Sequence, residues 1–317
     1  MNESAEVRAT AAPQPATRTA ATHTMLTLLK REVWEHPALW VAPLAVSAVL
    51  LVGAIFFRAY AHLPSTIPMS LGDGPPRPES AQTIATMGLV VGYAWTQYFV
   101  MGVVLWFYAT ACLYNERRDR SILFWKSMPV SDAKTVLSKM LMVLAVAPLY
   151  VYVVTLLTTL VASVIFAIPR FYGPSPFSLW SGGAWVRAQV FAFTWLVVAM
   201  LWYAPFNAYL LAISAWARRN VQLWALSPII AAIVERIAFG THYLWTWILY
   251  RLLPAWQWHG WQGFERVFSG PGFAPGQLFD GIDPLRGSEN IDLWIGLAVA
   301  VALLYAAVRI RRYRDDT

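Results

Sequence analysis

Long apolar runs, separated by short polar stretches, dominate the chain. Six runs are long enough to cross a bilayer as a helix, which takes about 20 apolar residues. They cover Leu39–Phe57, Met87–Cys112, Val136–Ile168, Trp185–Ser214, Leu223–Phe239 and Ile291–Ile310. None shows the period-two alternation of an outer-membrane strand, so the pattern predicts helices. We expect an all-α polytopic membrane protein with six transmembrane helices.

The third and fourth runs are longer than one crossing requires. Pro148 lies in the third and Pro205 in the fourth. A proline inside a helix removes one backbone hydrogen bond and clashes with the preceding turn. We therefore expect these helices to tilt, kink or project from the membrane, with Pro148 and Pro205 as the sites of a kink.

Composition agrees with a membrane location. Hydrophobic residues make up 58% of the chain and charged residues 13%, and the mean hydropathy is +0.49, whereas soluble domains carry about 25% charged residues. Cys112 is the only cysteine, which excludes an intrachain disulfide and a thiolate metal cluster. The five histidines are scattered, and the chain has neither H-E-x-x-H nor G-x-S-x-G, so the pattern indicates no enzyme.

Basic residues divide unequally between the two sides that six crossings create. About two thirds of the 24 Lys and Arg residues fall on the side that holds both chain ends. Cationic loops stay on the cytoplasmic side, so both termini are predicted to be cytoplasmic. The net charge of +7 fits contact with anionic lipid headgroups, and we expect no nucleic-acid partner.

The region before the first span divides into two parts. Residues 1–24 are rich in Ala, Thr and Pro and predict a disordered cytoplasmic tail. Residues 25–37 predict an interfacial amphipathic helix, with Lys30, Arg31 and Glu32 on its polar face. Its apolar face would carry Leu26, Leu29, Val33 and Trp34. A plain cytosolic extension of the first transmembrane helix is the alternative.

The largest internal polar segment is residues 114–139, YNERRDRSILFWKSMPVSDAKTVLSK. It predicts a short amphipathic helix, a break at Pro129, and a new helix capped by Ser131 and Asp132. Phe124 and Trp125 suit a knob that docks on a cytoplasmic partner, because aromatic residues dominate protein interfaces. Anchoring of the loop to the lipid interface is the alternative for the same two residues.

The segment 240–290 is the longest predicted external stretch. Five tryptophans lie in its first half: Trp245, Trp247, Trp256, Trp258 and Trp261. Indole rings favour the headgroup layer, so we expect short helices in the outer leaflet, with ligand stacking as the alternative. His242 and His259 share this segment without a placed carboxylate, which favours interfacial packing over a metal site.

Three polar residues within the predicted spans are candidate transport or helix-pairing residues. Glu235 lies towards the outer end of the fifth run, where it would pair with a neighbouring helix, line a substrate exit or reach outer headgroups. Gln97 and Asn207 carry amides that should face protein rather than lipid.

Two stretches resemble the permease subunits of ABC-2 type transporters. NERRDRSILFWKSMPVSDAKTVLSK is similar to the first cytoplasmic loop of that family, and SAWARRNVQLWALSPIIAAIVERIAFG is similar to its fourth loop and fifth span. The resemblance implies a type V exporter-like architecture across 38–317, with a cytoplasmic coupling helix that docks on an ATPase. It assigns ATPase coupling to Glu116, Arg117, Arg118, Asp119, Arg120, Ile122, Leu123, Phe124, Trp125, Lys126 and Pro129. Met128 stands where many members have leucine, a volume-conserving difference.

The same resemblance implies partners. The chain contains no G-x-x-x-x-G-K-[ST] and no Gly-Lys pair, so a separate ATPase subunit would bind ATP and Mg. A second permease copy, or a paralogue, would complete the unit in a bacterial cytoplasmic membrane. The expected activity is export of a lipid, peptide or drug-like amphiphile. The alternatives are a non-transporting scaffold that recruits a cytosolic partner through residues 114–139, and a polytopic enzyme, for which no polar cluster at one depth is evident.

Overall fold

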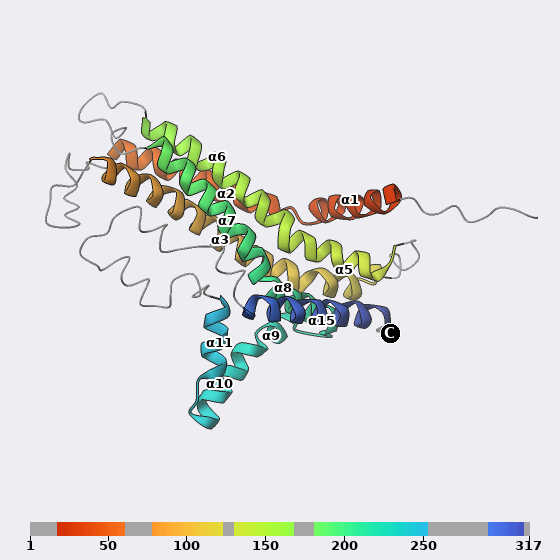
Figure 1. The fold of residues 1–317 in the computed structure, drawn as a ribbon. Helices are drawn as coiled ribbons and strands as arrows, with labels where there is room; N and C mark the ends of the chain where they lie inside the picture. Colours follow the sequence, from red (N-terminus) through yellow and green to blue (C-terminus); the bar gives the residue numbers. More distant parts are fainter. Residues whose placement is uncertain (1–17, 61–77, 123–129, 168–180, 253–290, 314–317) are drawn as a thin grey trace, which may run out of the picture.

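The computed structural model describes residues 18–60, 78–122, 130–167, 181–252 and 291–313. Regular structure in these residues is helical (Figure 1). The elements are α1 (Arg18–Glu35), α2 (Ala38–Tyr60), α3 (Pro78–Arg118), α5 (Asp132–Leu141), the π-helix η1 (Met142–Val146), α6 (Ala147–Ala167), α7 (Gly182–Trp202), α8 (Ala204–Trp216), α9 (Val221–Ala225), α10 (Ser227–Phe239), α11 (Tyr243–Leu252) and α15 (Ile291–Tyr313).

Five stretches of the described residues are long and apolar enough to cross a membrane. They are Ala38–Ala59, Thr86–Arg118, Asp132–Phe166, Gly182–Trp202 and Ile291–Tyr313. The all-helical, membrane-spanning character predicted from the apolar runs is therefore confirmed, but the described residues supply five such spans rather than the predicted six.

The fifth predicted span, Leu223–Phe239, is not one helix. It divides at Leu226 into α9 and α10, and Pro228 lies in the first turn of α10, where its missing N–H is tolerated. The 13 residues of α10 extend about 20 Å, short of a hydrocarbon core of about 30 Å. Gly240, with φ of 67°, then turns the chain into α11. The α10–α11 pair projects from the bundle as a helical hairpin (Figure 1).

Both predicted proline distortions are present. The π-helix η1 ends at Val146, two residues before Pro148. The N–H of the intervening Ala147 bonds to the Met142 carbonyl. Pro148 cannot bond to the preceding turn, and a π-bulge accommodates that loss. Helix α7 ends at Trp202, and Pro205 lies in the first turn of α8. The fourth predicted run is thus two helices that meet at Tyr203.

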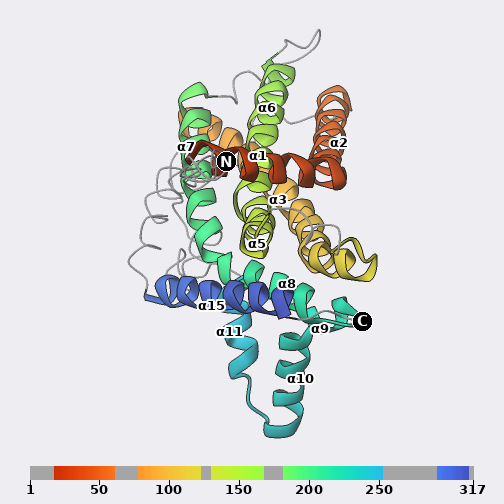
Figure 2. The same cartoon turned by 90° about the vertical axis from the view of Figure 1, so that its right-hand side faces the viewer.

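The main core lies among α3, α5, η1, α8 and α15. Helices α8 and α15 form the most extensive helix contact and lie side by side in both views (Figures 1 and 2). They run in the same direction, because the end of α8 contacts Arg117 on α3 and the end of α15 contacts Glu116 on α3. The end of α15 and the helix α1 consequently share one end of the bundle.

Helix α1 differs from the predicted amphipathic helix in extent and in orientation. It begins at Arg18 rather than at residue 25, so residues 18–24 are helical and only 1–17 of the predicted disordered tail lie outside the described residues. Leu28 and Glu32 are buried, whereas Leu26 and Trp34 are 63% and 76% exposed. Of the three residues assigned to the polar face, Glu32 therefore packs inward, where it meets the buried Lys139, whereas Lys30 stays exposed.

Candidate functional site

Glu116, at the end of α3, joins three other helices through one carboxylate. Its Oε1 lies 3.0 Å from Lys139 Nζ on α5 and 3.1 Å from Arg31 Nη2 on α1. Its Oε2 accepts a hydrogen bond from Arg311 Nη1 on α15. Charge-assisted contacts of this kind are the strongest hydrogen bonds in proteins. Glu116 is therefore the central acceptor of an ion network that ties α1, α5 and α15 to α3.

Glu32 is the second buried acceptor. Its Oε1 lies 2.8 Å from Lys139 Nζ, and its Oε2 accepts a hydrogen bond of 2.7 Å from the Tyr108 hydroxyl. Glu32 and Lys139 are each 1% exposed. Arg311 extends the network to Asp132 at the start of α5, with Nε 3.0 Å from Oδ1.

These side chains form what we call the charge cluster: Arg31, Glu32, Glu116, Asp132, Lys139 and Arg311. Its acids and bases balance in number, and each member contacts a group of opposite charge. Burying a charge costs several kcal/mol unless a partner compensates it, so removing one member is far more costly than replacing a whole pair. The cluster is therefore a set of interdependent contacts between helices.

Local sequence explains how these charges reach the interior. In α5, Lys139 shares the buried face with Val136 and Met140 at helical spacing. In α1, Glu32 follows Leu28 by four residues, so both lie on the same buried face. Because the apolar residues of each face are buried, the charged side chain on the same face is also buried and lies close to a partner on another helix.

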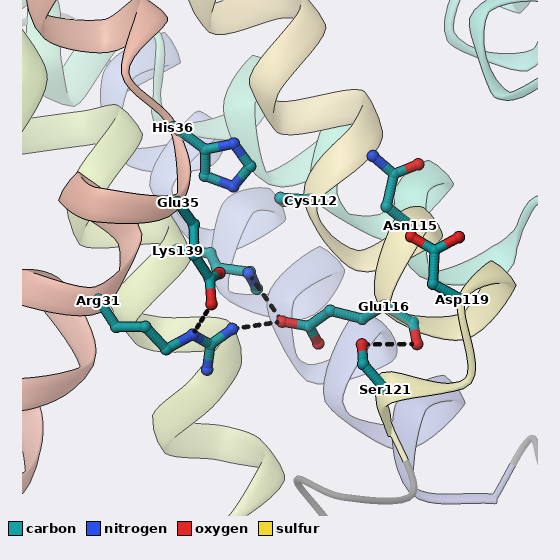
Figure 3. A pocket seen from close by; sticks show the side chains of 9 residues that line it. All are labelled: Arg31, Glu35, His36, Cys112, Asn115, Glu116, Asp119, Ser121 and Lys139. Carbon is teal, nitrogen blue, oxygen red and sulfur yellow. Dashed lines mark hydrogen bonds and ion pairs between the residues drawn. The ribbon is translucent and has the colours of Figure 1, made fainter.

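A cavity of about 390 Å³ opens beside the charge cluster (Figure 3). Its lining comes from α1, the α1–α2 junction, the end of α3, the turn after it, and α5. The lining residues are Arg31, Glu35, His36, Cys112, Asn115, Glu116, Asp119, Ser121 and Lys139. The cavity therefore borders the first residues of the loop that the sequence assigned to partner docking.

His36 lies at the inner wall of this cavity. Burial lowers the pKa of its imidazole despite the attraction of nearby Glu32, so the neutral ring is favoured. Its Nε2 is 3.8 Å from Glu32 Oε2, and its ring packs edge-on against Tyr108. Glu32, Glu35 and His36 could in principle converge on a cation, but both Glu32 oxygens already accept from Lys139 and Tyr108.

The predicted coupling residues divide into a described and an undescribed set. Arg117 and Arg118 end α3, and Arg117 Nη2 donates 2.8 Å bonds to the carbonyls of Ser214 and Ala217 at the end of α8. Asp119 and Arg120 form the turn, in which Arg120 adopts φ of 57°. Ile122 is half-buried. Leu123, Phe124, Trp125, Lys126 and Pro129 lie outside the described residues.

The predicted cap at the start of α5 is confirmed. Ser131 has an extended backbone conformation, and its Oγ accepts a 3.4 Å bond from the Lys134 N–H. Asp132 is the first helical residue, where its negative charge faces the positive end of the helix dipole. Asp132 thus serves both the helix start and the ion pair with Arg311.

Glu235 pairs with a neighbouring helix, the first of its three predicted roles. One carboxylate oxygen accepts from the Thr241 hydroxyl and the Tyr243 N–H, and the other accepts from the Leu244 N–H. These bonds, led by the one from Thr241, lower the pKa of Glu235. Glu235 therefore caps the start of α11 from within the hairpin.

The two predicted amides have different surroundings. Gln97 is buried; its Nε2 donates to Ser47 Oγ at 2.6 Å and to the Pro43 carbonyl at 3.2 Å, and Thr158 also donates to Ser47. Gln97 therefore faces protein and links α3 to α2 and α6. Asn207 is half-buried on α8.

The described part of the predicted external segment, residues 240–252, is largely exposed, although Ile248 is buried. Trp245 and Trp247 on α11 are among the exposed large side chains, and His242 stacks on Tyr243. Trp256, Trp258, Trp261 and His259 lie outside the described residues.

By sequence, Glu32, Lys139 and Arg311 are polar or basic residues of the predicted cytoplasmic side, and their burial was not predicted. One feature of the sequence pointed to a buried Lys139: it lies on the same face of α5 as Val136 and Met140. Partners that are 107 and 195 residues apart, as in the Lys139–Glu32 and Arg311–Glu116 bonds, leave no local pattern.

Comparisons with protein-family models, curated proteins and solved structures found no match. The ABC-2 resemblance therefore rests on the two quoted sequence stretches.

Proposed function

We propose that this chain is the membrane subunit of an ATP-driven exporter of the ABC-2 type. The observation that carries the proposal is the position of Glu116. It is the second residue of the family-like motif, it stands at the end of α3, and it contacts α1, α5 and α15. A force applied to the loop after α3 would reach three further helices through one carboxylate.

The proposed mechanism uses the charge cluster as a mechanical coupling. A partner ATPase docks on the loop around Phe124 and Trp125, and ATP-driven closure of that partner displaces the loop. Because buried ion pairs tolerate few intermediate geometries, the cluster favours discrete arrangements of the helices over gradual deformation. ATP binding then shifts the population between inward-open and outward-open states.

The direction of the helices supports the proposed six-crossing topology. Helices α8 and α15 end at the same end of the bundle, so the chain has to return to the other end of the bundle before α15 begins. We assign that return to α9, α10 and α11 together, because the end of α11 contacts Trp202 and Tyr203 beside the start of α8. Both termini would then be cytoplasmic, with the charge cluster at the cytoplasmic face of a bacterial cytoplasmic membrane.

The proposed partners follow from the same assignment. The ATPase subunit would bind ATP and Mg, and the chain itself would hold neither. The hairpin exposes the apolar side chains of Ile230, Ile233, Val234 and Ile237 on α10, and a second permease copy in a homodimer would cover part of this face. The substrate class is a lipid, peptide or drug-like amphiphile.

Affinity purification of the tagged chain from its native membrane, after mild crosslinking, tests the proposal. We expect an ABC ATPase in equal amount. Phe124→Ala with Trp125→Ala should abolish its capture, whereas the matched control Leu26→Ala with Trp34→Ala, at the exposed apolar side chains of α1, should not. Recovery of the chain without an ATPase would contradict the proposal.

A second variant separates an exporter from a scaffold. Glu116→Gln keeps the size of the side chain but removes the charge that Lys139, Arg31 and Arg311 share. In an exporter, this variant should still capture the ATPase but lose most of the ATP-dependent change in helix crosslinking. A scaffold would capture its partner and show no ATP-dependent change even in the wild type.

A further inference from the structure

Arg251 is a cation fixed at the end of α15 opposite to the charge cluster. It belongs to the last turn of α11, and its guanidinium carbon lies 4.3 Å from the centre of the Trp202 ring. The Asp292 carbonyl, at the start of α15, accepts a 3.3 Å bond from Arg251 Nη1. Asp292 lies 19 positions before Arg311, which corresponds to about 28 Å of helix. That distance is close to one hydrocarbon thickness of about 30 Å, so the two sites would lie at opposite headgroup layers.

The backbone around Arg251 is also fixed. Trp202 Nε1 donates a 2.9 Å bond to the Arg251 carbonyl, and the Tyr203 hydroxyl donates a 2.7 Å bond to the Leu252 carbonyl. These bonds attach the end of α11 to the break between α7 and α8. The position of the Arg251 side chain is thus set from two directions, by its ring platform and by its main chain.

Gly296 on α15 provides the space for the guanidinium. A Cβ atom at Gly296 would lie 1.7 Å from Arg251 Nη2 and 2.9 Å from Cζ. No side chain is compatible with that approach unless Arg251 moves. Gly296 is therefore part of the cradle that holds Arg251.

Arg251 differs in its partners from Arg31 and Arg311, the two arginines of the charge cluster. Arg31 and Arg311 each form ion pairs, but no carboxylate of the described residues lies within 4.0 Å of Arg251, and the carboxylate of nearby Asp292 accepts from the Tyr250 hydroxyl. Burial lowers the pKa of Arg251. An oriented guanidinium that bonds to one backbone carbonyl among the described residues is suited to a planar or tetrahedral oxyanion.

The surroundings suit an amphiphile rather than a free ion. Trp245 and Trp247 on α11 and Ile291, Trp294 and Ile295 at the start of α15 are exposed and apolar. Such side chains at the level of a headgroup layer would contact acyl chains, while a cation on the same surface meets the headgroup.

We propose that Arg251, on the platform of Trp202 and Gly296, binds the phosphate group of an anionic amphiphile at the headgroup layer. The phosphate would belong to a phospholipid of the bilayer or to a soluble phosphate compound. The inference uses the geometry at α7, α11 and α15 and does not rest on the proposed exporter function.

Native mass spectrometry of the purified full chain in detergent tests the proposal. The probes are phosphatidylglycerol, diacylglycerol with the same acyl chains, and inorganic phosphate. Wild type should bind phosphatidylglycerol more tightly than diacylglycerol, and Arg251→Gln should weaken that binding roughly tenfold, as expected for loss of a charge-assisted hydrogen bond. Binding of inorganic phosphate alone, lost in Arg251→Gln, would identify a soluble source, and binding of the lipid alone would identify the bilayer.

Two further variants distinguish the cradle from charge in general. Gly296→Ala keeps the cation but displaces it, so it should weaken phosphatidylglycerol binding in the same direction as Arg251→Gln. Arg236→Gln removes an exposed arginine from α10 of the same hairpin and should leave binding unchanged. Equal binding by wild type and Arg251→Gln, or an equal loss in Arg236→Gln, would overturn the proposal. Unchanged melting temperatures would verify that the variants are folded.

Discussion

The Lys139 ammonium lies 2.8 Å from the Glu32 carboxylate, and both side chains are 1% exposed. The two residues stand 107 positions apart in the chain, on α5 and α1. This pair holds α1 against the bundle, so α1 is an integral part of the fold and only its outer face, with Leu26 and Trp34, remains exposed.

Lys139→Met should strongly destabilise the protein. The substitution leaves the Glu32 carboxylate buried with one hydrogen bond, from the Tyr108 hydroxyl, and with Arg31 Nη2 at 3.6 Å and His36 Nε2 at 3.8 Å. Breaking a buried pair costs about 3–5 kcal/mol. Unfolding of the purified protein by denaturant in detergent would measure this loss.

A double variant provides the control for this experiment. Glu32→Gln combined with Lys139→Met removes both charges and should recover much of the lost stability, because the uncompensated carboxylate is gone. Equal losses in the single and double variants would show that packing of the Lys139 stem, and not its charge, holds the helices together.

Ser131→Ala should weaken the start of α5. The Ser131 hydroxyl accepts from the Lys134 N–H, and loss of an N-cap typically costs about 1 kcal/mol. Hydrogen exchange at residues 132–135 should become faster, while Ser131→Asp, which retains an acceptor, should preserve the slow rate. Identical exchange in the alanine variant and the wild type would exclude a capping role for this hydroxyl.

Glu235→Gln should loosen the tip of the α10–α11 hairpin. The carboxylate accepts from the backbone N–H groups of Tyr243 and Leu244, and an amide provides only one oxygen for these bonds. Exchange of those two amides should accelerate, whereas Arg236→Gln, at an exposed neighbour, should leave it unchanged. An export defect with unchanged amide exchange would instead favour a role of Glu235 at a substrate exit.

Features encoded within a few residues were predictable from the sequence. Apolar runs gave the long helices, Pro148 and Pro205 marked their distortions, and the Ser131 cap followed from residue type and spacing. These features depend on helix length, backbone hydrogen bonding and proline sterics, which act locally.

Features that depend on distant partners were not predictable. The run Leu223–Phe239 has the composition of a span, but its division at Leu226 and the turn at Gly240 redirect it into a hairpin. Likewise, Glu32 belongs to the polar residues of α1 by sequence, and only the presence of Lys139 on another helix makes its burial favourable. The composition of a segment shows whether it could cross a membrane, whereas tertiary contacts determine its path and which of its faces is buried.

The pH dependence of stability should contain a contribution from His36. Burial lowers the pKa of its imidazole below the ordinary value of 6.5, and the charged groups that face it are Glu32, Glu35, Arg31 and Lys139. The unfolded chain therefore binds the proton more tightly than the folded chain, so this contribution is fully present above the unfolded pKa and is lost as pH falls through the folded pKa. The melting temperature of the wild type should fall more steeply than that of His36→Gln between about pH 7.5 and about pH 5.5. Parallel curves for the two proteins would show that His36 has the same proton affinity in both states, and that acid sensitivity comes from elsewhere in the chain.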